Sequence, residues 1–184
     1  QADAIPVLKE LGADVHTPDQ YGFTPMHLAA IKGHAGAIRA LHELGADLNA
    51  RSYDGLTAMY SAAAYGHTDA IRVLHELGAD LNAAHHNGFT PMHIAAQEGH
   101  PDAIRVLKTL GANVNTPNKY GSTPMHIAAE NGHADAIRVL HELGADLNAI
   151  NNNNGYPPIH LAAQEGQADA IRVLHELEAK EPSR

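Results

Sequence analysis

The sequence contains no cysteine and no tryptophan, and aromatic residues make up only 4% of its 184 residues. Without cysteine, the chain has no disulfides, no thiolate catalysis and no zinc site built on cysteine. The shortage of aromatic rings argues against a globular core built around Phe, Tyr and Trp, which usually supply its largest buried surfaces. Because 44% of the residues are nevertheless hydrophobic, we expect a core of many small, similar contacts between Ala, Leu, Ile and Val.

Basic residues are also scarce, since 12 Lys and Arg stand against 21 Asp and Glu, giving a formal net charge of −9. Nucleic-acid binding needs a basic surface, so we expect no nucleic-acid partner. The sequence has no apolar run near the roughly 18 residues that span a bilayer, and no signal-peptide pattern, so we expect no membrane insertion. These absences favour an intracellular, cytoplasmic protein, with a bacterial effector acting inside a host cell as one form of it.

An internal repeat of 33 residues dominates what is present. Glycines keep this step at Gly12, Gly45, Gly78, Gly111 and Gly144. The chain is therefore interpreted as one array over residues 1–184. It divides into a partial repeat (1–16), four repeats (17–50, 51–83, 84–116 and 117–149) and a terminal repeat (150–184) with a one-residue loop insertion and a polar tail.

The sequence of each repeat predicts a turn followed by two helices. Thr24 is a good N-cap, and Pro25 suits the first helical position, where a missing N–H costs nothing. After a Gly-His pair, residues 37, 38, 41 and 44 are apolar at the spacing of an amphipathic second helix. We expect five first helices and six second helices, the earliest of them over residues 1–11 without a first-helix partner.

The pattern G-x-TPMHxAA-xx-GH-xx-AIRVLHELGADLNA resembles the ankyrin repeat over almost the whole chain. The resemblance implies an all-α repeat fold, a curved ankyrin-type solenoid of helix-turn-helix units joined by β-hairpin loops. Ile5 and Leu8 follow the internal pattern with nothing in front to cover them, so we expect the array to be cut from a longer one. Glu178 replaces a capping Gly before a polar tail, which we interpret as a true end.

Histidine is abundant, with 15 residues, but twelve of them fall in three repeated slots. The slots are His27, His93, His126 and His160 on the first helix; His34, His67, His100 and His133 after the inter-helix Gly; and His42, His75, His141 and His175 on the second helix. A zinc site needs three or four converging ligands, whereas stacked repeats hold equivalent side chains a helix spacing apart. We therefore expect no metal and no cofactor.

The resemblance implies that a first-slot His hydrogen-bonds the nearby Thr and the backbone of the next repeat. Once such a His is protonated, the ring nitrogen that accepted a hydrogen bond must donate one instead. We therefore expect the array to loosen at mildly acid pH.

Catalysis is not expected. The sequence has no nucleophile elbow, phosphate loop, dinucleotide fingerprint or metalloprotease motif. Its charged residues recur with the repeat, as in the predicted i,i+4 pairs Arg39–Glu43, Arg72–Glu76, Arg138–Glu142 and Arg172–Glu176. Catalytic groups should be unique, so the chain is predicted not to be an enzyme.

Binding residues should lie where the repeats differ, because the constant positions build the scaffold. The variable positions cluster at the loop tips and at the ends of the first helices, and the resemblance implies that both line the concave face on which ankyrin proteins usually bind partners. The predicted partner is another protein, of unknown identity. The candidate residues are Gln20, Tyr21, Phe23, Lys32, Tyr53, Asp54, Tyr65, His86, Asn87, Phe89, Glu98, Lys119, Tyr120, Asn131, Asn153 and Tyr156.

Three alternatives stay open. Phe23 and Phe89 either bind a partner or cover their hairpins. The array is either a binding module or a passive spacer within a longer chain. Asn49, Asn82 and Asn148 end a motif that resembles the substrate of asparaginyl hydroxylases, and the alternative is that this Asn braces the hairpin. Asn115 departs from the motif, because Asn113 stands in place of Asp.

Overall fold

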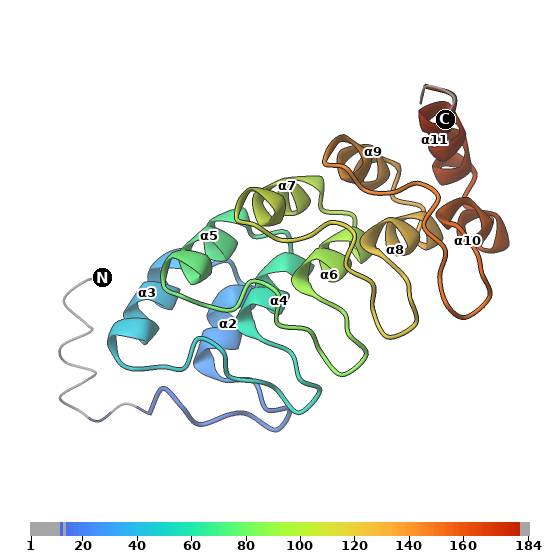
Figure 1. Cartoon of the computed structure of the whole chain (residues 1–184). Helices are drawn as coiled ribbons and strands as arrows, with labels where there is room; N and C mark the ends of the chain where they lie inside the picture. Colours follow the sequence, from blue (N-terminus) through green and yellow to red (C-terminus); the bar gives the residue numbers. More distant parts are fainter. Residues whose placement is uncertain (1–11, 13, 181–184) are drawn as a thin grey trace.

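The computed structural model describes residue 12 and residues 14–180 (Figure 1). The predicted second helix over residues 1–11 and the last residues of the polar tail lie outside the described residues. Within them, the chain forms ten helices and no β-strand. The predicted all-α repeat fold is confirmed, and the hairpin-shaped loops are held by turns.

The helices alternate between a short first helix and a longer second helix in each repeat. The first helices have seven residues each and follow an extended N-cap residue: α2 (Pro25–Ile31), α4 (Ala58–Ala64), α6 (Pro91–Gln97), α8 (Pro124–Glu130) and α10 (Pro158–Gln164). The second helices are α3 (Ala35–Glu43), α5 (Thr68–Glu76), α7 (Pro101–Thr109), α9 (Ala134–Glu142) and α11 (Ala168–Glu178).

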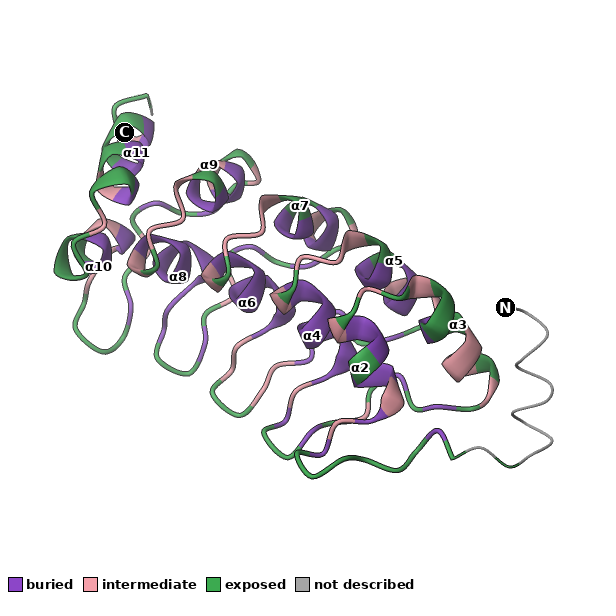
Figure 2. Cartoon of the chain, turned by 180° about the vertical axis from the view of Figure 1, so that it is seen from behind, coloured by how far each residue is buried: buried purple, intermediate pink, exposed green. Residues whose placement is uncertain are grey.

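The helices stack in two layers. Each first helix packs on the first helix of the next repeat and on the second helix of its own repeat, and the second helices pack on one another in the same order. The loops project from the stack on one side (Figure 1). Buried residues run between the layers, and exposed residues gather at the loop tips (Figure 2).

The core repeats with the sequence. The largest fully buried side chains occupy equivalent positions, such as Ile38, Ile71, Ile104 and Ile137, each at 0% exposure. Ala pairs on the first helices let neighbouring helices approach closely. Among the described residues, Tyr60 is the one buried aromatic residue, so the expectation of a core built from small contacts is confirmed.

The first-slot histidines fasten three of the four junctions between complete repeats. His27 Nδ1 accepts a hydrogen bond from the Thr24 N–H at 3.1 Å, so the proton of the neutral ring is on Nε2, which donates to the Leu56 carbonyl of the next repeat at 2.9 Å. His93 and His126 make the equivalent bonds, to the carbonyls of Ser122 and Tyr156. All three rings are fully buried, and the predicted bonding is confirmed for these three members of the slot. The fourth, His160, is exposed and its ring makes no hydrogen bond within the described residues.

The second-slot histidines fasten each repeat to the one before it. His67, His100 and His133 donate through Nε2 to the carbonyls of Ile31, Ala64 and Gln97, at 2.9, 3.0 and 2.7 Å. Gln167 takes the same place in the last repeat and donates to the Glu130 carbonyl at 3.1 Å. Each junction between complete repeats is therefore bonded from the second slot, although the sequence alone indicated no role for these residues.

Tyr60 interrupts the first-slot pattern in the second complete repeat. Its backbone N–H donates to the Thr57 hydroxyl at 3.2 Å, so the helix cap is kept. The phenol does not reproduce the bond of an imidazole Nε2 to the next repeat within the described part of the chain. Its ring lies 5.6 Å from that of His85. Burial, with a smaller contribution from Glu98, raises the pKa of Tyr60 to about 12.

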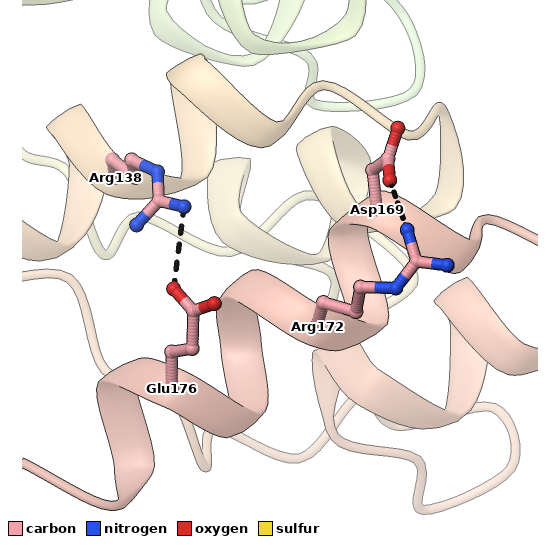
Figure 3. A network of polar contacts seen from close by, with 4 residues as sticks. All are labelled: Arg138, Asp169, Arg172 and Glu176. Atoms are coloured by element: carbon pink, nitrogen blue, oxygen red, sulfur yellow. Dashed lines mark hydrogen bonds and ion pairs between the residues drawn. The ribbon is translucent and has the colours of Figure 1, made fainter.

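The predicted i,i+4 ion pairs on the second helices are wrong. Arg39 reaches Glu76 on the next second helix at 2.6 Å, and Arg105 reaches Glu142 in the same way at 2.6 Å. Arg138 lies 3.3 Å from Glu176 (Figure 3). The second helices pack side by side, which brings the Arg of one repeat opposite a Glu of the next. These pairs are about half exposed, so each contributes roughly 0–1 kcal/mol.

We predict that the array loses stability between about pH 7 and about pH 5. Burial lowers the pKa of His27, His93 and His126 below the ordinary 6.5, to about 4 for His93. When folding lowers the pKa of a His, the contribution of that His to stability is fully present above its unfolded-state pKa. This contribution is lost as the pH falls toward its folded-state pKa. His93 alone should cost about 2 kcal/mol at pH 5.

Urea denaturation of the original chain and of His93→Gln at both pH values measures this loss. The variant should lose less stability between the two pH values than the original, whereas the exposed control His175→Gln should lose as much. Equal free energies of unfolding of the original chain at both pH values would contradict the prediction.

Two Gly→Ala variants distinguish two causes of lost stability: backbone strain at a positive φ, and a clash of the new Cβ with a second-slot histidine. Gly99 and Gly166 have φ of +68° and +70°, which disfavour a side chain equally. A Cβ at Gly99 would lie 2.5 Å from His133 Nδ1, whereas nothing lies within 4 Å at Gly166. Gly99→Ala should therefore destabilise the protein by about 1–3 kcal/mol more than Gly166→Ala in urea denaturation. Equal losses of stability in the two variants would contradict the prediction, since they would show that the His133 ring moves aside without an energetic cost.

Candidate protein-binding surface

The loop tips are shaped by the residue that opens each turn. Asp19 accepts hydrogen bonds through Oδ1 from the backbone N–H groups of Tyr21 and Phe23, both at 2.9 Å. The Asp19 N–H in turn donates to the Phe23 carbonyl at 2.9 Å. His85, Asn118 and Asn151 open their turns with comparable side-chain bonds. Because the turn-opening residue satisfies the backbone, the tip side chains are left to face outward.

Neighbouring tips are joined to one another by backbone hydrogen bonds. The Tyr53 N–H donates to the Tyr21 carbonyl at 3.2 Å. Two equivalent bonds join later tips, from Lys119 to Asn87 at 3.1 Å and from Asn152 to Tyr120 at 3.0 Å. At the remaining junction the His86 ring nitrogen Nε2 lies 3.5 Å from the Tyr53 carbonyl, so the tips lie in one row along the stack.

Four tyrosines stand out on this surface. Their exposed fractions are 61% for Tyr21, 70% for Tyr53, 57% for Tyr65 and 43% for Tyr120. Three of them lie at tips, and Tyr65 follows α4, where its ring stacks on that of His67 at 6.3 Å. Most other candidate residues are also exposed: Gln20, Lys32, Asp54, His86, Asn87, Glu98, Lys119, Asn131 and Asn153.

The remaining three candidates, Phe23, Phe89 and Tyr156, are half-buried. Each ring lies beside the first-slot histidine of its own repeat, with centroid distances of 5.4, 5.3 and 5.3 Å. The Phe89 ring also stacks on His85 at 5.4 Å. These contacts favour the alternative that the two Phe cover their hairpins, and their place in a binding site stays a prediction.

The later part of this surface is acidic. Partial burial and the nearby charge of Glu165 raise the pKa of Glu130. In the described part of the chain, Glu98, Glu130 and Glu165 form no ion pair with a Lys or Arg, in contrast to the Glu residues paired with Arg on the second helices. Glu130 and Glu165 are absent from the predicted set, because their proximity arises only when adjacent repeats stack.

Comparison with known families agrees with this geometry. A family model for ankyrin repeats, in three copies, matches residues 1–85, 44–118, 83–151 and 110–183. The chain belongs to the ankyrin repeat family. A search of curated proteins found no match.

The candidate modification residues of this ankyrin array lie at the start of the loops between repeats, and all are exposed. Asn49 Oδ1 accepts a hydrogen bond from the Asp80 N–H of the next repeat at 2.8 Å. Asn115, which departs from the hydroxylation motif, makes the same bond to Asp146 at 2.9 Å. These contacts favour the bracing role. Hydroxylation of Asn49, Asn82 and Asn148 stays a prediction.

Two further features concern metals and membranes. Across residue 12 and residues 14–180, no group of three or more His, Asp or Glu is placed to hold a metal ion. The longest helix among them, α11, has 11 residues, and none of the described helices is long and apolar enough to cross a membrane.

Proposed function

We propose that this ankyrin array binds a partner protein through its loop tips and the exposed ends of its first helices. Ankyrin repeats are generally protein-interaction modules. The observation that carries the proposal is the exposure of Tyr21, Tyr53, Tyr65 and Tyr120 in a scaffold whose other described aromatic residues are half-buried or buried. Tyrosine is a favoured anchor in protein interfaces, because it offers a large amphipathic contact at low cost in conformational entropy.

The charge of the surface indicates the chemistry of the partner. Glu98, Glu130 and Glu165 lie at the C-terminal ends of first helices, without an ion pair in the described part of the chain. Tyrosine faces and carboxylates both attract Lys and Arg side chains. A partner segment that carries basic residues therefore fits this surface better than an acidic one.

Two other functions compete with this proposal. A passive spacer would place no partner on the tip surface, and the exposed tyrosines count against it. A substrate of an asparaginyl hydroxylase would gain mass on incubation with such an enzyme, and an unchanged intact mass would end that hypothesis.

We predict that changing the four exposed tyrosines to Ser abolishes retention of the partner without affecting the fold. The original chain and the variant Tyr21→Ser, Tyr53→Ser, Tyr65→Ser, Tyr120→Ser are immobilised and exposed to cell lysate, and retained proteins are identified by mass spectrometry. A matched control changes His42, His75, His141 and His175 to Ser, which removes the same number of rings from the second helices. Circular dichroism checks that all three are equally folded.

A protein retained by the original and the control but lost by the tyrosine variant supports the proposal. Addition of salt should weaken that retention, since basic groups on the partner are screened. Equal retention by the original and the tyrosine variant, or none by either, would contradict the proposal and favour the spacer.

A further inference from the structure

Asparagine is followed directly by glycine at three places in the chain, Asn87-Gly88, Asn131-Gly132 and Asn154-Gly155. In this dipeptide the backbone nitrogen of the glycine can attack the side-chain amide carbon of the asparagine. Glycine permits the attack best, since it has no Cβ to obstruct the approach and adopts the widest range of backbone conformations. The hydrogen bonds around each pair therefore decide how readily it reacts.

In four repeats the glycine at the loop tip is held by the residue that opens the turn. The N–H groups of Gly22, Gly55, Gly88 and Gly121 donate to the carbonyls of Asp19, Ser52, His85 and Asn118, at 3.0, 2.8, 2.9 and 3.0 Å. In each of these tips the acceptor lies three residues before the glycine. A glycine nitrogen bonded in this way must lose its acceptor before it attacks, which slows the reaction.

The loop between α9 and α10 departs from this arrangement because of its one-residue insertion (Figure 1). Asn151 opens the turn four residues before Gly155, and the Gly155 N–H makes no hydrogen bond within the described residues. The Asn151 side chain closes the turn instead, since its Oδ1 accepts from the N–H groups of Asn154 and Tyr156 at 3.2 and 3.4 Å. The insertion thus leaves the nitrogen of Gly155 without the bond that restrains the other tip glycines.

The side-chain amide of Asn154 is also placed for the attack. Its Oδ1 accepts a hydrogen bond from the Tyr156 N–H at 3.2 Å. Attack at Cγ turns this oxygen into an oxyanion, and a donor already directed at the oxygen stabilises the developing charge. The loop therefore supplies both a reactive nitrogen and a polarised amide.

The pair Asn131-Gly132 has the opposite surroundings. The Gly132 N–H donates to the Ala129 carbonyl at 3.2 Å. Asn131 Nδ2, the group that would leave, donates to the Ile127 carbonyl at 2.9 Å. Both reacting groups of this pair are held by bonds that the reaction must break.

The exposure of Asn154 does not depend on its place in the last repeat. The residue directly before the tip glycine is exposed in all five repeats, namely Tyr21, Asp54, Asn87, Tyr120 and Asn154. Four of these tips are followed by a further repeat. Water therefore reaches this position whether or not another repeat packs against the tip.

We propose that Asn154 is a site of spontaneous modification, at which the side-chain amide is converted to a carboxylate through a cyclic imide. The Gly155 nitrogen gives its proton to solvent and forms a bond to Asn154 Cγ. The bond from Cγ to Nδ2 then breaks, and the side-chain nitrogen takes up a proton and leaves as ammonia. The product at this stage is a five-membered ring that joins the Asn154 side chain to the backbone.

Water opens the ring at either of its two carbonyls, and the nitrogen of Gly155 regains its proton. Opening at Cγ gives aspartate, whereas opening at the main-chain carbonyl gives isoaspartate, in which the backbone runs through the former side chain. Each product adds a negative charge beside Asn153, a candidate binding residue. Isoaspartate also lengthens the backbone of the loop whose Tyr156 carbonyl accepts from His126 at 3.0 Å. The modification itself requires no partner.

Peptide mapping of the original chain by mass spectrometry, during incubation at mildly alkaline pH, tests the proposal. Asn154 should be converted about three- to tenfold faster than Asn87 and Asn131, the factor expected for the loss of one backbone hydrogen bond. Enzymatic methylation of isoaspartate identifies the second product. Conversion at Asn154 that is no faster than at Asn87 would overturn the proposal.

The same incubation in urea separates the effect of the loop from that of the dipeptide. Unfolding removes the hydrogen bonds that distinguish the three pairs, so Asn87, Asn131 and Asn154 should then be converted at similar rates. An equally large preference for Asn154 in the unfolded chain would show that the fold does not set the rate, and would overturn the argument from the loop.

A deletion and a matched control locate the cause in the insertion. Removal of one residue from the run 151–154 restores the three-residue spacing, so the glycine N–H is again able to reach the carbonyl of the turn-opening Asn. Conversion of the Asn before this glycine should slow by about three- to tenfold. The control Asn152→Ser keeps the insertion and should be converted like the original. Circular dichroism verifies that both variants are folded, and unchanged conversion in the folded deletion variant would contradict the proposed cause.

Discussion

The stack depends on buried neutral imidazoles that cross the junctions between repeats. His93 illustrates the constraint: its Nδ1 accepts from the Thr90 N–H, and its Nε2 donates to the Ser122 carbonyl of the next repeat at 3.1 Å. One ring thereby satisfies the helix cap and a loop carbonyl at once, in a place where an unpaired polar group would be costly. With apolar contacts made only of small and medium side chains, these bonds fix the register in which the repeats stack.

Because the repeats stack in a fixed register, their variable side chains are held next to one another and form a surface. Backbone bonds such as Tyr53 to Tyr21 tie three of the four pairs of neighbouring loops, so tips far apart in sequence lie in one row. Residues at the tips and at the first-helix ends vary between copies without disturbing the scaffold. The turn-opening residue satisfies the backbone at the tips, and carbonyls of the same helix accept from the backbone N–H groups at the first-helix ends.

The repeat period was sufficient to predict two helices in each unit and their order, whereas the ankyrin-type solenoid and the bonding of the first-slot histidines followed from the resemblance to the family. The exposure of Tyr21, Tyr53, Tyr65 and Tyr120 followed from their variable positions. The partners of the second-helix Arg residues could not be predicted, because they depend on how adjacent helices align across a junction. For the same reason, neither the hydrogen bond of His67 to the preceding repeat nor the proximity of Glu130 to Glu165 could be predicted. Sequence periodicity indicates which residues are equivalent, but not which equivalent pairs meet.

The protonation state of His93 tests the central role of the imidazoles most directly. Long-range proton–nitrogen NMR correlations of the ring report which nitrogen carries the proton and the pKa at which the second proton binds. The account predicts a neutral ring with the proton on Nε2 at neutral pH and a pKa of about 4. A proton on Nδ1, or a pKa near the ordinary value of 6.5, would contradict it.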